Sequence, residues 1–441
     1  MYTPEDNQLS FEKGWFIIPQ VDKNHELIKL ADSIDWNSLS EKMSGFYCPD
    51  NGRPTKPTRL KLGLLILKHR CKLSDREAVE ILKRDIYFQY FCDISLPQVH
   101  THPIHHSTLS LFRKQIGTEG IKILEDELFR FLKKEHKLKG RQLVVDTTIV
   151  PSPIQYPTDV HLLEKCRRKA IKFIDEAKTW TGTGYRTYKR VAQKVFITYT
   201  KIRHHTRKSR RKAQKKLLQY ARRNVSQLKD VIKKMASAPN KTKEKFFKKA
   251  HTFYKTAKKF IKQQHEIYKG KHVKERIVSL WAPHIRPMVR GKYPQDVEFG
   301  PKILLNMKNN FLFFQGYSFN NVNDQLLLTH SIESYKTTFG HIPSELAADR
   351  GFFSRNNVIK SKEMGIPKVA IQPKGKAPPK RKDPPFTKRL RRRRCAIEAK
   401  ISLAKRCFGL NKINYRIPHG EEIWIRLGLL AMNYHIAMEY G

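Results

Sequence analysis

Three acidic residues stand where metal-assisted chemistry would need them. Asp146 follows the apolar run 143–145, and Asp349 follows the apolar run 346–348. A carboxylate at the end of a buried strand is costly unless it is solvated, paired or bound to a cation. Glu398 is the candidate for a third acid. Because Mg²⁺ and Mn²⁺ prefer carboxylate and water oxygens, the set predicts a site for two divalent ions acting on a phosphodiester.

Cations flank the third acid on a predicted helix. Arg394 lies four residues before Glu398 and Lys405 lies seven after it, so the three share one helical stripe. The adjacent stripe is apolar and faces a core. Such a carboxylate could serve a metal and DNA together. The alternative is an ordinary amphipathic helix with an i, i+4 Arg–Glu pair, and each acid taken alone favours a structural role.

Taken together, these residues resemble the DDE transposases of bacterial insertion sequences. The family branch with a Tyr-x2-Arg-x3-Glu-x6-Lys signature is the best match, and here the signature has Arg391 in place of the tyrosine, followed by Arg394, Glu398 and Lys405. The first-acid block reads Val-Val-Asp-Thr-Thr-Ile-Val, and the second reads Ala-Asp-Arg-Gly-Phe-Phe. The segments 73–77, 106–113 and 297–302 also resemble family segments. The similarity covers about residues 40–160 and 296–435.

The resemblance implies an RNase H-like catalytic domain in which Asp146, Asp349 and Glu398 are catalytic and hold two Mg²⁺ or Mn²⁺ ions. Water would cut the DNA at the terminal inverted repeats, and the freed 3′-OH would attack target DNA. Arg391, Arg394 and Lys405 would contact DNA, and two synapsed ends imply a homodimer on DNA. The alternatives are a non-catalytic DNA-binding protein derived from a transposase, which predicts damaged acids, and an RNA-binding protein, which leaves the order of the acids unexplained.

The charge of the chain predicts a polyanionic partner. The 441 residues include 88 Lys and Arg against 40 Asp and Glu, a formal net charge of +48. Residues 161–295 concentrate this charge, with 40 Lys and Arg against 7 Asp and Glu. A field of one sign is the footprint of nucleic-acid binding, with anionic membrane as the second possibility and simple solubility as the alternative.

The pattern of elements predicts a mixed α+β protein with three regions. Residues 1–140 are predicted to be a helical domain that binds the terminal repeats, either through a helix-turn-helix-like unit or as a bundle that only packs. Arg113, on a short helix opened by 107–108, would then reach a base or phosphate. Residues 141–160 and 296–441 are predicted to form the catalytic domain, and 161–295 a basic helical insertion within it. Strands are expected at 142–147, 297–305, 311–317, 345–349 and 368–371.

The remaining features predict the compartment. The N-terminus has no basic and apolar signal pattern, and the longest apolar runs are far short of the ~20 residues of a membrane helix. We therefore expect a cytoplasmic, nucleoid-associated protein whose partner is DNA, with neither a membrane nor a small-molecule substrate.

Overall fold

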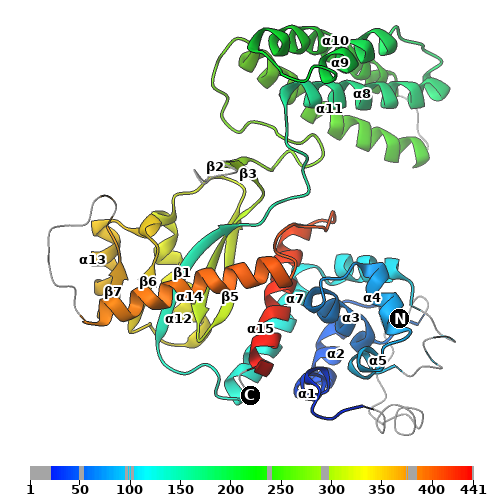
Figure 1. Cartoon of the computed structure of the whole chain (residues 1–441). Coiled ribbons are helices and arrows are strands. Elements are labelled where there is room, and N and C mark those ends of the chain that lie inside the picture. The colour runs from blue at the N-terminus through cyan, green and yellow to red at the C-terminus, as the bar shows by residue number, and fades with distance from the viewer. Residues whose placement is uncertain are drawn as a thin grey trace. The chain divides into compact units, whose positions relative to one another are not determined.

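The computed structural model describes residues 21–48, 54–94, 98, 100, 104–235, 241–289, 297–373, 375 and 385–439, and within this set the side chains of 241–243 are left out. The chain forms two compact units (Figure 1). The first unit runs to Pro153 and resumes at Pro301, and the second is Ile154–Gly300.

A five-stranded mixed sheet is the centre of the first unit. Its strand order is β5-β4-β1-β6-β7. The strands β5, β4 and β1 are antiparallel, whereas β1, β6 and β7 are parallel. Their bounds are β1 Gln142–Ile149, β4 Lys302–Lys308, β5 Phe311–Ser318, β6 Glu345–Ala348 and β7 Lys368–Ile371. The expected mixed α+β fold class, with a helical N-terminal region and an α/β region built on this sheet, is confirmed.

Helices cover both faces of this sheet. On one face α14 (Pro385–Cys407) packs against β1, β6 and β7. On the other face α12 (Leu328–Phe339) packs against β1 and β4, and α13 (Arg355–Glu363) packs against β7. Successive side chains of a strand point to opposite faces. Accordingly Val144 of β1 belongs to the hydrophobic cluster that includes α14, whereas Leu143 and Val145 belong to the cluster with α12.

The N-terminal helices do not form a separate core. They share one hydrophobic cluster with α14, with α15 (Gly420–Glu439) and with one face of the sheet. A capping box opens α4, because the Ser74 side chain and Glu77 satisfy each other's backbone amides. The helices are α1 Glu26–Ser33, α2 Trp36–Ser44, α3 Thr58–Arg70, α4 Asp75–Leu82, α5 Ile86–Cys92 and α7 His106–Lys134.

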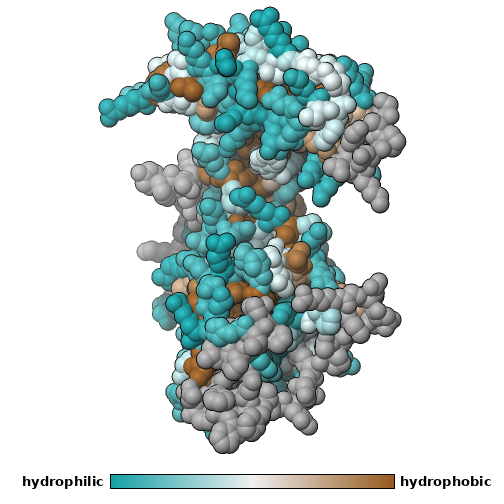
Figure 2. Space-filling model, turned by 90° about the vertical axis from the view of Figure 1, so that its right-hand side faces the viewer, coloured by the Kyte–Doolittle hydropathy of each residue, from teal (hydrophilic) through white to brown (hydrophobic). Residues whose placement is uncertain are grey.

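The second unit is a helical bundle with its own hydrophobic core. It contains α8 Asp159–Thr181, α9 Lys189–Thr200, α10 Arg207–Met235, α11 Lys241–Tyr268 and the short strands β2 Pro287–Val289 and β3 Val297–Phe299. Leu217, Phe253 and Phe260 are among its buried side chains. Figure 2 shows that the face of this bundle turned toward the viewer is mostly hydrophilic, with scattered hydrophobic residues. Each helix therefore buries one apolar stripe and exposes its cations.

One sequence prediction about elements needs correction. The strand expected over 297–305 is two strands, β3 and β4, because Gly300 and Pro301 interrupt it and proline lacks the amide that a ladder needs. The short helix expected from 107 is present as the first part of α7, and a break at Gly117, whose φ is 56°, separates it from a longer second part. None of the described helices is both long and apolar enough to cross a membrane.

Candidate active site

The register of two parallel strands brings the first two acids together. Val145 of β1 is paired with Ala348 of β6. Asp146 and Asp349 each come one residue later, Asp146 within β1 and Asp349 directly after the end of β6, and neighbouring strands are spaced by about 4.8 Å. The alternation of side chains also places both on the face covered by α14, because Val144 and Ala347, two residues before each acid, belong to the cluster on that face.

The helix α14 supplies the third acid to the same place. Ile397 and Ile401 are buried in the cluster under α14, so the stripe beside them faces the edge of the site. Arg394 lies on this stripe and one of its nitrogens, Nη1, contacts two of the acids. It is 3.3 Å from Asp349 Oδ1 and 2.5 Å from Glu398 Oε1. The carboxylates of Asp349 and Glu398 therefore flank a single guanidinium nitrogen.

Asp146 is the acid whose ionisation is most disturbed. Its Oδ1 accepts a hydrogen bond of 2.7 Å from the backbone amide of Thr147, which lowers its pKa. Burial outweighs this bond and, together with the negative charges of Asp349, Glu398 and Asp324, raises the pKa of Asp146 to about 7. Burial and the neighbouring acids both disfavour the charged form of Asp146, and a bound cation would favour it.

Asp324 is a fourth acid near the site that the sequence analysis did not select. It lies in the 3-10 turn Asp324–Leu327, and its Oδ1 accepts a hydrogen bond of 2.9 Å from Thr147 Oγ1. Lys302 Nζ is 2.6 Å from the same oxygen. A Cβ at Gly351 would lie 2.7 Å from Asp324 Oδ2, so the glycine of the second-acid block leaves room for this carboxylate. Acidic residues are common in the first turn of a helix, where they favour the helix dipole. The sequence therefore gives no sign that Asp324 belongs to the site.

The predicted DNA-contacting residues lie in two different settings. Arg391, Arg394 and Lys405 are half-buried on α14, and their spacing puts them on one stripe with Glu398. Arg113 is different, because its side chain is only 3% exposed. Its Nη1 and Nη2 donate to the two oxygens of Asp75 at 2.9 and 2.5 Å. The guanidinium is thus engaged inside the fold rather than exposed on the surface of the helix.

The carboxylates suit a divalent ion by their chemistry, but Arg394 stands among them. In the described part of the chain, no group of three or more His, Cys, Asp or Glu side chains is arranged to hold a metal ion. Asp349 and Glu398 are instead paired with the Arg394 guanidinium. The donors are carboxylate oxygens, and burial together with the neighbouring acids raises the pKa of Asp146, so the donor set suits Mg²⁺ or Mn²⁺ by its chemistry. A bound ion would compete with Arg394 for its two partners.

Comparisons with known proteins match two stretches of the chain to transposase domains. Two family models match the chain, the Transposase domain (DUF772) over residues 16–115 and the Transposase DDE domain over residues 300–434. A protein of Rhizobium meliloti described as "Uncharacterized protein ORF8 in nfe locus" is 33% identical over 189 residues, which is 42% of this chain and 88% of that protein. No solved structure matches the chain. The second model spans Asp349 and Glu398, whereas Asp146 precedes it.

Proposed function

Because the chain belongs to the DDE transposases of bacterial insertion sequences, we propose that it cuts DNA at the terminal inverted repeats of its element and joins the freed 3′-OH ends to target DNA. One observation carries this proposal. Asp146, Asp349 and Glu398, which are far apart in the sequence, converge beside α14, where Arg394 bridges two of them and the third has a raised pKa.

The residues have distinct roles in the proposed reaction. Asp146, Asp349 and Glu398 would hold two Mg²⁺ or Mn²⁺ ions, which when bound supply the charge that activates a water and stabilises a leaving oxygen. Arg394 neutralises Asp349 and Glu398 before DNA arrives. If its guanidinium were released from these two carboxylates, it would be available for a DNA phosphate. Both the cut and the joining are in-line displacements at phosphorus, so one set of residues serves both.

The rest of the chain would bind the DNA around this site. The N-terminal helices would contact the terminal inverted repeats, and the cationic bundle would add phosphate contacts. Two ends held together require at least a dimer on DNA, and the place of action would be the bacterial nucleoid in the cytoplasm. A non-catalytic descendant would not be expected to keep three acids converging on one place, and an RNA-binding role leaves this convergence unexplained.

Substitution of the second acid tests catalysis directly. Asp349→Asn preserves the shape of the side chain but removes its charge, so cleavage of end-containing DNA should fall by roughly a hundredfold or more. Asp146→Asn and Glu398→Gln should have similar effects, and double variants should lose little more, because residues that act as a unit are not additive. DNA binding should persist. The assay combines a denaturing gel for cleavage in Mg²⁺ with a mobility shift for binding.

The control is Glu363→Gln, which removes an exposed carboxylate of α13. It should cleave at the wild-type rate. Cleavage by Asp349→Asn at the rate of this control would refute the catalytic assignment. Equal loss of cleavage and of folding in all three acid variants would mean that the acids are structural.

A further inference from the structure

A second polar site lies in the first unit, formed by the N-terminal helices and the segment between α14 and α15. A cavity of about 610 Å³ opens between the α3–α4 connection, α7 and residues 409–424. We call it the Lys68 pocket. The residues of its lining that matter here are Lys68, Lys72, Asp75, Arg113, Lys412 and Arg416.

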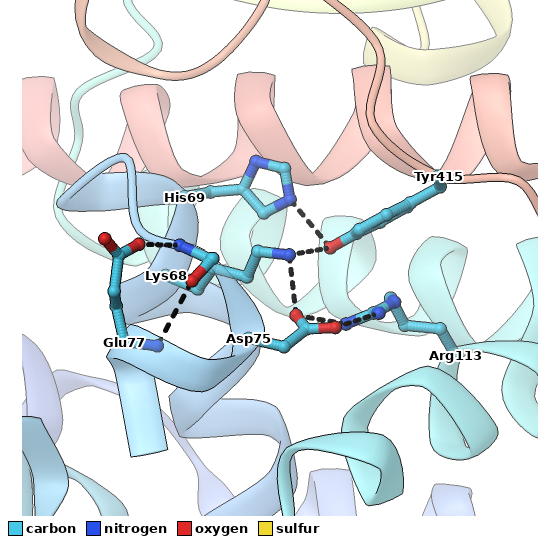
Figure 3. A network of polar contacts seen from close by, with 7 residues as sticks. Lys68, His69, Asp75, Glu77, Arg113 and Tyr415 are labelled. Carbon is cyan, nitrogen blue, oxygen red and sulfur yellow. Dashed lines mark hydrogen bonds and ion pairs between the residues drawn. The ribbon is translucent and has the colours of Figure 1, made fainter. Parts of the chain in front are cut away.

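The floor of the Lys68 pocket is a network built around one carboxylate (Figure 3). Asp75 is held on one side by the two nitrogens of Arg113 and on the other by Lys68 Nζ at 2.6 Å. Tyr415 continues the network, because its hydroxyl lies 3.2 Å from Lys68 Nζ and 3.2 Å from His69 Nε2. Arg113 also stacks its guanidinium over the Tyr415 ring, 4.1 Å from the centroid.

This arrangement leaves the pocket with excess positive charge. Among the described residues that line it, five are Lys or Arg and two are Asp or Glu. Neither acid is available to a ligand cation. Asp75 is shared by two cations, and Glu77 accepts the backbone amide of Ser74 in the capping box. Burial and the charges of Lys68 and Arg113 lower the pKa of His69, which keeps that ring neutral.

Two buried cations are incompletely paired in this arrangement. Lys68 and Arg113 have side chains only 5% and 3% exposed, yet they divide one carboxylate between them. Burial and the neighbouring Arg113 lower the pKa of Lys68 to about 8, although Asp75 opposes this shift. The buried Nε of Arg113 has no hydrogen-bond partner among the described residues. Because a buried cation is costly without a counter-charge, the pocket favours an incoming anion.

We propose that the Lys68 pocket binds a phosphate group of the DNA backbone. The exposed cations Lys72, Lys412 and Arg416 form a rim that would attract the strand, while Lys68 and Arg113 supply charge from below. The proposal rests on the proposed function, since it takes DNA as the source of the phosphate. It also links DNA contact to the catalytic helix, because Lys72 Nζ donates to the carbonyl of Arg406 on α14 at 3.1 Å.

The test uses the exposed rim, whose substitution leaves the buried network in place. The double variant Lys412→Gln with Arg416→Gln should weaken binding of a labelled duplex carrying the element's end several-fold. It should also make the slope of log K against log salt shallower by about one, as expected for one lost phosphate contact. The matched control, Lys29→Gln with Lys114→Gln, removes two exposed cations of the same unit outside the pocket and should change the slope less.

Acylation of lysines, mapped by mass spectrometry, locates the contact in the wild-type protein. DNA should protect Lys72 and Lys412, while Lys29 and Lys114 stay reactive. Equal effects of the rim and control variants, or no selective protection, would overturn the proposal. Protection by inorganic phosphate with unchanged DNA binding of the rim variant would assign the pocket to a small anion and also overturn it. If the wild-type protein cleaves end DNA but the rim variant and the protection experiment do not give the expected results, only this inference is refuted. The proposed function then stands.

Discussion

Asp146 shows how a single residue is prepared for a cation by its neighbours. Its strand is buried on both faces, and its carboxylate sits beside two other acids of the site and Asp324. Arg394 contacts Asp349 and Glu398, whereas the local partner of Asp146 is the amide of Thr147. Ionisation of Asp146 is therefore unfavourable in the folded protein when no cation is bound. The cost appears as a loss of folding stability, which can be measured.

Measurements of folding stability at different pH values can detect the raised pKa of Asp146. The pKa of Asp146 is about 7 in the folded protein and 3.8 ordinarily, so the carboxylate costs the folded state stability as pH rises between these values. Without divalent ions, Asp146→Asn should therefore raise the melting temperature by a few degrees, and more at about pH 8 than at about pH 5. Added Mg²⁺ should stabilise the wild type at the higher pH but not the variant, because only the folded wild type binds it.

The exposed Glu363→Gln variant serves as the control and should leave the melting temperature unchanged at both pH values. Thermal unfolding followed by circular dichroism is sufficient for the measurement. A gain for Asp146→Asn that is the same at both pH values, or smaller at the higher one, would contradict the raised pKa.

At this scale the sequence reveals the residues but not their partners. The order of acids and the helical spacing of Arg394 and Glu398 were enough to nominate candidates for the site. Asp324 was missed because its proximity depends on the path of the chain between β5 and α12. The burial of Arg113 could not be foreseen for a similar reason, since its partner Asp75 lies 38 residues away on another helix. Pairings between elements leave no periodic signal in either segment.

Among the elements, α15 covers the edge of the sheet that β5 forms. β5 is the outermost strand on one side, and an edge strand presents unpaired backbone groups. Asn433 of α15 is 3% exposed, and its amide pairs with both backbone groups of Leu312. It accepts from the Leu312 amide at 3.0 Å and donates to the Leu312 carbonyl at 2.8 Å. The C-terminal helix therefore substitutes for a neighbouring strand at this position.

Removal of this side chain should be costly. Asn433→Ala would leave a buried amide and a buried carbonyl of Leu312 without partners, so the free energy of unfolding should fall by about 2–4 kcal/mol. Chemical denaturation measures the change. Asn356→Ala, on the exposed side of α13, is the matched control and should stay within about 0.5 kcal/mol of the wild type. A loss for Asn433→Ala no larger than that of the control would show that α15 does not close the edge.

The elements themselves were largely predictable. The basic insertion expected at 161–295 is helical as predicted and contains α10 and α11, because an apolar stripe recurs at helical spacing among the cations. The role of α15 as cover for β5 was not predictable. It depends on one polar residue, Asn433, within an apolar run. Asn433 pairs with backbone groups of Leu312, and the sequence of the strand does not mark which backbone groups will have such a partner.

For the whole molecule, the main feature is where the basic bundle enters the catalytic domain. Ile149 at the end of β1 is paired with Lys302 at the start of β4, and the Val150 amide donates to the Pro301 carbonyl at 3.1 Å. The chain thus leaves the sheet and returns to it at the same place, where a hairpin turn would suffice. The change in charge at residues 161 and 295 lies just inside the bounds of the second unit, Ile154–Gly300.

This geometry predicts that the bundle can be removed without unfolding the rest. The hydrophobic clusters of the first unit contain no residue of Ile154–Gly300 among those described, and the bundle has a cluster of its own. Replacement of Ile154–Gly300 by a short Asn-Gly turn should therefore give a folded protein. Its binding to end DNA should show a much shallower dependence on salt, because the phosphate contacts of the bundle are gone.

A second variant separates the charge of the bundle from its presence. Lys208, Lys212, Lys215 and Lys216 are exposed on α10, and changing all four to Gln keeps the bundle while removing part of its field. We expect this variant to fall between the wild type and the excised protein in salt slope, with each lost contact contributing about one. Fluorescence anisotropy across a salt series measures all three proteins. An unchanged salt slope in both variants would mean that the charge of the bundle serves solubility. Unfolding of the excised protein would show that the first unit depends on the bundle for its stability.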